Sequence, residues 1–311
     1  MNYPIVSSKY TIKRELECLN EFMSYGQCLD GQSEWVSVVS HGIDGFVEKY
    51  EESYRILINN GIPYRYRKLF WPQMLKFDTN IDYKMLAQCE HEYSETIKLD
   101  VPRTFVNLPF ISSDSKQKLY RILNAFSGCK KDIGYYQGMN YIAGTILLVY
   151  NLEEKESFDS FLGIMLKFNL LDLYKDNFTL LLKYISKFNY MLKILNPNLT
   201  KYFDDNGIDF SIYLQQWFLT LFVVNFPIRT VLILWDYILG NGIESILDIS
   251  LSILSILESQ ILQLDMEGFA SLFRSLKENN TYDDYKMALF IVKHAINVSK
   301  RTETLKLRLK S

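Results

Sequence analysis

The segment from Met139 to Tyr150 constrains the fold more than any other, because its residues are apolar on nearly every side. A helix with one apolar stripe lies on a protein surface, whereas a helix that is apolar all round has to be enclosed by other elements. The chain has 311 residues, of which 48% are hydrophobic, and this is enough to form such an enclosure. We therefore predict that this segment is a buried helix that anchors the core.

Helical spacing of apolar residues continues through most of the chain. Leu119, Ile122, Leu123 and Phe126 follow the i, i+3, i+4, i+7 pattern, and Ser127-Gly128 stands where this helix should end. The same spacing predicts helices over residues 214–222, 231–238 and 243–264. No segment combines period-two alternation with a hairpin turn. We predict an all-α, multi-helix fold with no significant β-sheet.

The domain organisation predicted from the sequence has three parts. Residues 1–32 are polar and are expected to form an N-terminal lead-in. Residues 33–295 are expected to form one large domain, built from two helical subdomains, and residues 296–311 a basic C-terminal tail.

Charge and composition exclude several classes of function. The 34 basic and 36 acidic residues give a net charge of −2, which argues against nucleic acid as the main partner. Four cysteines without a CxxC pair, together with three histidines, indicate no zinc site. The apolar stretch from Trp217 to Trp235 contains Pro227 and Arg229 near its centre, so a turn between two core helices is expected there, and no transmembrane segment.

Two short segments carry side chains suited to chemistry on a phosphate group. Residues 97–104 place Arg103 after an aspartate and a proline, and residues 135–139 place Gln137 directly before Gly138. Hydrolysis of a nucleoside triphosphate needs a cation beside the transferring phosphoryl group and a group that orients the attacking water. An arginine and a glutamine can supply these two functions.

Five sequence blocks, in order along the chain, extend this pattern. They are Gly61-Ile-Pro63 with Arg67 and Trp71, Ile97-x-x-Asp100-x-x-Arg103-Thr104, Tyr135-x-Gln137-Gly138, Trp217-Phe-Leu219 with Phe222 and Pro227, and Trp235-Asp236 with Gly242. With these blocks the chain resembles a TBC domain, the family of GTPase-activating proteins for Rab-type small GTPases. The resemblance covers about residues 35–290.

The resemblance implies a function in vesicle trafficking. The chain would bind a GTP-loaded Rab and supply Arg103 as an arginine finger and Gln137 as a glutamine finger in trans. It would then be a GTPase activator that supplies catalytic residues in trans, and whether it counts as an enzyme in its own right is left open. We expect no cofactor or metal of its own, because GTP and Mg²⁺ are carried by the partner. We expect a cytoplasmic protein, with peripheral association with endomembranes left open.

Supporting roles follow for residues near the two fingers. Asp100 could hold the guanidinium of Arg103 by a bidentate pair or could pin the loop, and we favour loop support. Thr104 belongs to the same block. Gly138 would allow two backbones to approach closely, and Tyr135 is expected to pack beneath the loop with its hydroxyl bonded.

The first block is expected to be structural. Arg67 and Trp71 lie one helical turn apart, which suits a stacking or ion-pair unit better than a catalytic one.

Two alternatives to an active GTPase activator remain at this point. One is a catalytically silent scaffold or effector that has the same fold and binds a Rab without accelerating hydrolysis. The other is a helical adaptor unrelated to GTPases, which would show no dependence on Arg103 or Gln137.

Overall fold

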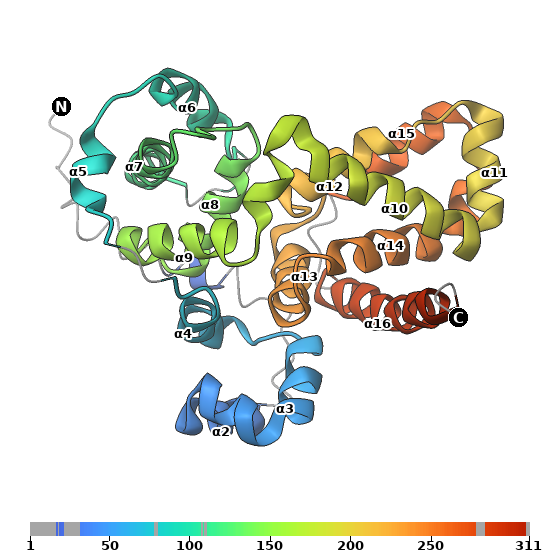
Figure 1. Cartoon of the computed structure of the whole chain (residues 1–311), viewed down its shortest axis with the longest axis horizontal. Helices are drawn as coiled ribbons and strands as arrows, with labels where there is room; N and C mark the ends of the chain where they lie inside the picture. The colour runs from blue at the N-terminus through green and yellow to red at the C-terminus, as the bar shows by residue number, and fades with distance from the viewer. Residues whose placement is uncertain are drawn as a thin grey trace, which may run out of the picture. The chain divides into compact units, whose positions relative to one another are not determined.

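A computed structural model describes residues 17, 19–21 and 32–308, with gaps at 78–79, 107, 109–110 and 278–283. Every regular element among these residues is a helix, which confirms the predicted all-α fold (Figure 1). The predicted lead-in over residues 1–32 lies almost wholly outside the described part of the chain.

The helices belong to two compact units. The first unit includes residues 63–163, and the second includes residues 28–62 and 164–311. The elements of the first unit are α4 (Tyr64–Met74), α5 (Tyr83–Gln88), α6 (Ser94–Asp100), η1 (Val101–Arg103), α7 (Ser113–Cys129), α8 (Met139–Val149) and α9 (Glu154–Leu166), whose last residues pass into the second unit. The elements of the second unit are α2 (Gln32–His41), α3 (Ile43–Asn59), η2 (Leu170–Leu173), η3 (Asp176–Phe178), α10 (Thr179–Leu195), α11 (Pro197–Asn206), α12 (Ser211–Thr220), α13 (Ile228–Asn241), α14 (Ser245–Ile261), α15 (Met266–Ser275) and α16 (Asp284–Arg308).

Helix α7 organises the first unit by packing against α5, α6 and α8. The Ser112 hydroxyl caps its start by accepting a hydrogen bond from the Ser115 N–H at 3.2 Å. The helix continues through Ser127 and Gly128 and ends at Cys129, later than the sequence indicated. The Ser127 hydroxyl donates to the Leu123 carbonyl at 2.9 Å, one turn back in the same helix, so this serine does not stop the helix.

Helix α8 is the buried helix predicted from Met139 to Tyr150. Every one of its residues except Tyr141 is buried, and it packs against α4 and α7. The prediction of an enclosed helix at the core of the chain is confirmed for this unit.

In the second unit, α14 packs against α10 and α16, and α13 packs against α3, α14 and α16 (Figure 1). Helix α13 contains the predicted helix over residues 231–238 and ends at Asn241, directly before Gly242, which has a φ of 89°. Helix α12 ends at Thr220, before Leu221 and Phe222, which the periodicity had placed inside it. Both residues have positive φ, and the Leu221 carbonyl accepts a hydrogen bond from the Trp235 indole at 2.9 Å instead of one from its own helix.

The turn expected around Pro227 lies between α12 and α13. Within the described residues, no helix is long and apolar enough to cross a membrane. Arg229 is buried in the first turn of α13 and pairs with Asp284 of α16 at 3.0 Å, with both side chains less than 5% exposed. The positive charge of Arg229 is therefore balanced by the buried negative charge of Asp284.

Helix α16 runs on to Arg308 and includes most of the segment predicted as a basic tail.

Replacing Asp284 by alanine should lower the free energy of unfolding by about 3–5 kcal/mol, because it leaves the Arg229 guanidinium buried without its counter-charge. Chemical denaturation measures this change. Asp159→Ala is the matched control, since the Lys155–Asp159 pair is 58% and 45% exposed and should contribute no more than about 0.5 kcal/mol. Equal effects of the two substitutions would contradict the structure.

A second ion pair joins three helices of the first unit. Arg121 of α7 donates from Nε and Nη2 to the two carboxylate oxygens of Glu154 at 2.7 Å each, and Glu154 also accepts from the Tyr83 hydroxyl at 2.5 Å. Burial disfavours the charged form of Glu154, but these hydrogen bonds outweigh it and hold the pKa of Glu154 below its ordinary value of 4.5. The charged carboxylate therefore stabilises the junction of α5, α7 and α9.

The Arg121–Glu154 pair should make the folded protein less stable in acid. The unfolded chain takes up a proton at Glu154 at a pH where the folded protein does not, so the contribution is present above pH 4.5 and is lost as the pH falls below that value. In Glu154→Gln the free energy of unfolding should fall less between neutral and acid pH than it does in the wild type. Urea denaturation at several pH values measures this difference. Glu156→Gln, an exposed position on the same helix, should leave the pH dependence unchanged.

Candidate functional site

Arg103 lies at the end of a tight turn that we call the arginine turn, residues 100–104. Helix α6 ends at Asp100 and the chain continues into a 3₁₀ turn, Val101–Arg103, in which Pro102 fixes the backbone. The Arg103 side chain is 58% exposed, whereas that of Asp100 is 2% exposed. The turn thus presents a guanidinium to solvent and keeps the acidic residue inside.

Asp100 contacts both predicted finger segments. One carboxylate oxygen accepts a hydrogen bond from the Arg103 guanidinium, and the other accepts from the Tyr135 hydroxyl at 2.6 Å. Asp100 holds the guanidinium with one oxygen and pins the loop with the other. The pair with Arg103 is therefore not bidentate.

Gln137 lies in what we call the glutamine turn, residues 134–138. Gly138 has a φ of 114° and immediately precedes α8, a conformation that a residue with a side chain rarely adopts. Tyr135 is buried, and Gln137 is exposed. Among the described residues, the Gln137 side chain has no hydrogen-bond partner, so its amide is available to a ligand or a partner protein.

A second link between the two turns runs through Asn140, near the start of α8. Its side-chain Nδ2 donates to the Thr104 hydroxyl at 2.7 Å, and its Oδ1 accepts from the Gly138 N–H at 3.0 Å. Thr104 in turn donates to the Asp100 carbonyl at 2.9 Å. Sequence reasoning missed Asn140. The signal was present, because an amide side chain stands near the start of an otherwise apolar segment.

The residues that follow Arg103 pack against helix α8. Phe105 has a φ of 54°, and its ring packs edge-on against Tyr141 of α8 with centroids 5.8 Å apart. Burial raises the pKa of the Tyr141 hydroxyl, and the positive charge of Arg103 opposes this change in part. Tyr141 is therefore a neutral side chain beside the arginine turn at physiological pH.

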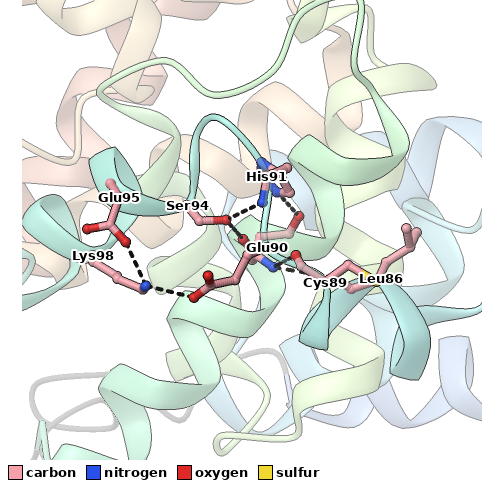
Figure 2. A network of polar contacts seen from close by, with 8 residues as sticks. Leu86, Cys89, Glu90, His91, Ser94, Glu95 and Lys98 are labelled. Carbon is pink, nitrogen blue, oxygen red and sulfur yellow. Dashed lines mark hydrogen bonds and ion pairs between the residues drawn. The ribbon is translucent and has the colours of Figure 1, made fainter.

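A polar network holds the other end of α6 (Figure 2). The side chain of Asn124, on α7, accepts from the Ser94 hydroxyl at 2.7 Å and donates to the Cys89 carbonyl at 2.7 Å. The carbonyl of Asn124 bonds to the His91 ring at 2.9 Å. These bonds fix the loop between α5 and α6 on α7, and with it the helix that carries the arginine turn.

The same loop covers the start of the glutamine turn. The Tyr93 ring lies so close to Gly134 that a Cβ at that glycine would be 2.0 Å from the ring. The backbone N–H of Tyr93 donates to the His91 ring at 3.2 Å, which ties the tyrosine to the network. Both turns therefore rest on one hydrogen-bonded scaffold.

Arg67 and Trp71 are not available for contact with a partner protein. Both are fully buried side chains of α4. Neither forms a hydrogen bond with Arg103 or Gln137. Their burial suits the predicted structural unit and leaves no surface for chemistry.

Comparison with known proteins decides the family. The model of the Rab-GTPase-TBC domain matches residues 64–262, more than half of the chain. The chain belongs to this family. All residues of the arginine turn and the glutamine turn lie inside the segment that matches the TBC domain.

Solved TBC domains share the fold. The crystal structure of a Chlamydomonas flagellar RabGAP TBC domain superposes with a TM-score of 0.70 at 21% identity, covering 93% of this chain and 96% of that one. The Ypt/Rab-GAP domain of Gyp1p superposes with a TM-score of 0.68 at 18% identity, covering 80% and 93%.

Curated relatives extend well beyond the shared domain. The Caenorhabditis elegans Rab GTPase-activating protein eat-17 is 29% identical over 243 residues, which is 76% of this chain and 27% of that protein. The Saccharomyces cerevisiae GTPase-activating protein GYP5 is 30% identical over 211 residues, which is 67% of this chain and 23% of that protein. The chain thus spans about a quarter of the length of these relatives.

Removing the Tyr135 hydroxyl should destabilise the first unit. Tyr135→Phe leaves one oxygen of the buried Asp100 carboxylate without its donor, and we expect the free energy of unfolding to fall by about 1–3 kcal/mol. Tyr120→Phe is the control, because this partly exposed hydroxyl of α7 bonds to none of the described residues. Denaturation curves for the two variants should differ, and coincident curves would contradict the assigned bond.

Proposed function

We propose that this TBC domain is a GTPase-activating protein for a Rab-type small GTPase, and that Arg103 and Gln137 enter the nucleotide site of that partner. One observation carries the proposal. An exposed arginine and an exposed glutamine stand on two turns joined beneath the surface by the carboxylate of Asp100. Two Caenorhabditis elegans relatives, eat-17 and tbc-11, are Rab GTPase-activating proteins, which supports the same activity.

The proposed role of Arg103 is to stabilise charge in the transition state. During phosphoryl transfer, negative charge spreads over the phosphoryl oxygens, and a guanidinium placed there stabilises the transition state more than the ground state. Such a finger is worth about 10³–10⁵ in rate for small GTPases. The guanidinium has five N–H donors, so it can keep one on Asp100 while others reach the phosphate.

The proposed role of Gln137 is to orient the attacking water. An amide can accept a hydrogen bond from the water and donate one to a neighbouring group, which sets the line of attack without introducing charge. The side chain is exposed and uncommitted among the described residues, so no internal bond has to break before it engages a partner.

In this proposal GTP and Mg²⁺ enter with the partner, and the chain contributes only its own side chains. The GTP-bound form of the GTPase is the expected target, since its switch segments are ordered by the γ-phosphate and relax after hydrolysis. That relaxation would release the product complex. We place the activity in the cytoplasm, with peripheral association with the endomembranes that carry Rab proteins.

Single-turnover GTP hydrolysis across a panel of Rab GTPases tests the proposal. We expect the wild-type chain to accelerate at least one Rab, and Arg103→Ala to reduce that acceleration by about 10³-fold or more. Gln137→Ala should reduce it by about 10²-fold or more, because the water loses its orientation. Arg103→Lys should not restore the rate, since an ammonium lacks the planar fork of donors.

Matched surface variants control for charge and composition. Arg55 is an exposed arginine of α3 that pairs with Glu51, an acidic residue a few positions earlier in the chain, as Asp100 is for Arg103. Gln117 is an exposed glutamine of α7. Arg55→Ala and Gln117→Ala should keep the full rate. Binding without acceleration on the whole panel would support a silent scaffold instead, and full activity of both finger variants would reject the proposal.

A further inference from the structure

Two separate links join the turns that carry the fingers, and they meet the glutamine turn on opposite sides of Gln137. Tyr135, two residues before Gln137, reaches Asp100 through its hydroxyl. Gly138, the residue after it, reaches Thr104 through the side chain of Asn140. The backbone of Gln137 is therefore held from both sides by the arginine turn.

Resting on the proposed function, we propose that Asn140 is a positioning residue that fixes the orientation of Gln137 relative to Arg103. It acts through Thr104 on one side and the Gly138 N–H on the other, and it touches neither finger.

The energetics of burial favour this role. Asn140 is 1% exposed and Thr104 is also 1% exposed, and an unpaired amide or hydroxyl so far removed from water would be costly. The donor and the acceptor of Asn140 are both used, one by each turn. A leucine would fill the same space in α8 without that cost, so the amide contributes something other than packing.

Local bonding within the glutamine turn does not by itself place Gln137 relative to Arg103. The Met139 N–H donates to the Tyr136 carbonyl at 3.2 Å and closes the backbone around Gln137 and Gly138. Gly138 has a φ of 114°, and glycine has low barriers to rotation, so this closed turn can still pivot about Tyr135. The bond from the Gly138 N–H to Asn140, which is itself bonded to Thr104, ties the turn to the arginine turn and sets the direction in which Gln137 leaves the backbone.

Thr104→Val tests the coupling because it removes the hydroxyl while keeping the shape of the side chain. Thr145→Val is the matched control, because Thr145 is a fully buried threonine of the same unit. Within the described part of the chain its hydroxyl bonds to one group, the Tyr141 carbonyl of the same helix, at 2.8 Å. Thr104→Ser keeps the hydroxyl and should restore the wild-type behaviour.

The first readout needs no GTPase. Hydrogen exchange at the Gly138 amide should become about threefold to tenfold faster in Thr104→Val, although the substitution lies in the other turn, and it should not change in Thr145→Val. Equal exchange in wild type and Thr104→Val would overturn the coupling, even if no GTPase substrate were found.

The second readout uses a Rab that the wild-type chain accelerates. We expect Thr104→Val to lower kcat by about tenfold or more while KM changes by less than about twofold, because the surface that meets the GTPase is intact. The effect of Thr104→Val should shrink in a Gln137→Ala background, since the positioned group is gone.

The two proposals fail in different ways. If wild type accelerates a Rab and both finger variants are inactive, while Thr104→Val behaves like Thr145→Val, the proposed function stands and the role of Asn140 is rejected. If Thr104→Val raises KM and leaves kcat unchanged, Thr104 supports binding of the GTPase. The positioning role of Asn140 is rejected in that case too.

Discussion

The buried carboxylate of Asp100 is the interaction on which the rest of the site depends. An ionised group that is almost fully removed from water is unstable unless its oxygens are bonded. Its two oxygens find partners on different segments, the guanidinium of Arg103 and the hydroxyl of Tyr135. Satisfying one charge therefore brings together two turns that are separated in sequence by α7, and it does so at the surface of a rigid helical unit.

This arrangement explains how two exposed side chains can be ready for a partner without being buried themselves. Pro102 restricts the backbone beside Arg103, and α8 supports the glutamine turn from below. Ordering loops and side chains during association lowers affinity, and placing the reacting groups in advance reduces that cost. The chain holds the backbone of both turns and leaves the side chains of Arg103 and Gln137 exposed, which suits the proposed role in completing the catalytic site of another protein.

Sequence patterns predicted the elements well where the determinant is local. The buried helix α8 and the helix predicted over residues 231–238, which lies inside α13, follow from hydrophobic spacing. The end of α12 could not be predicted in this way, because Leu221 leaves the helix to accept a bond from Trp235, which comes later in the chain. Motif blocks selected Arg103, Gln137 and Asp100, whereas Asn140 was overlooked because its function depends on partners in another segment.

The most direct measurement is a crystal structure of this chain bound to a Rab that carries GDP, Mg²⁺ and aluminium fluoride, in which the fluoride mimics the transferring phosphoryl group. We expect the Arg103 guanidinium and the Gln137 amide both to lie within hydrogen-bond distance of the fluoride or of the attacking water, with Asp100 still bonded to Arg103 and Tyr135. A complex in which the glutamine of the GTPase itself orients the water, with Gln137 turned away, would contradict it.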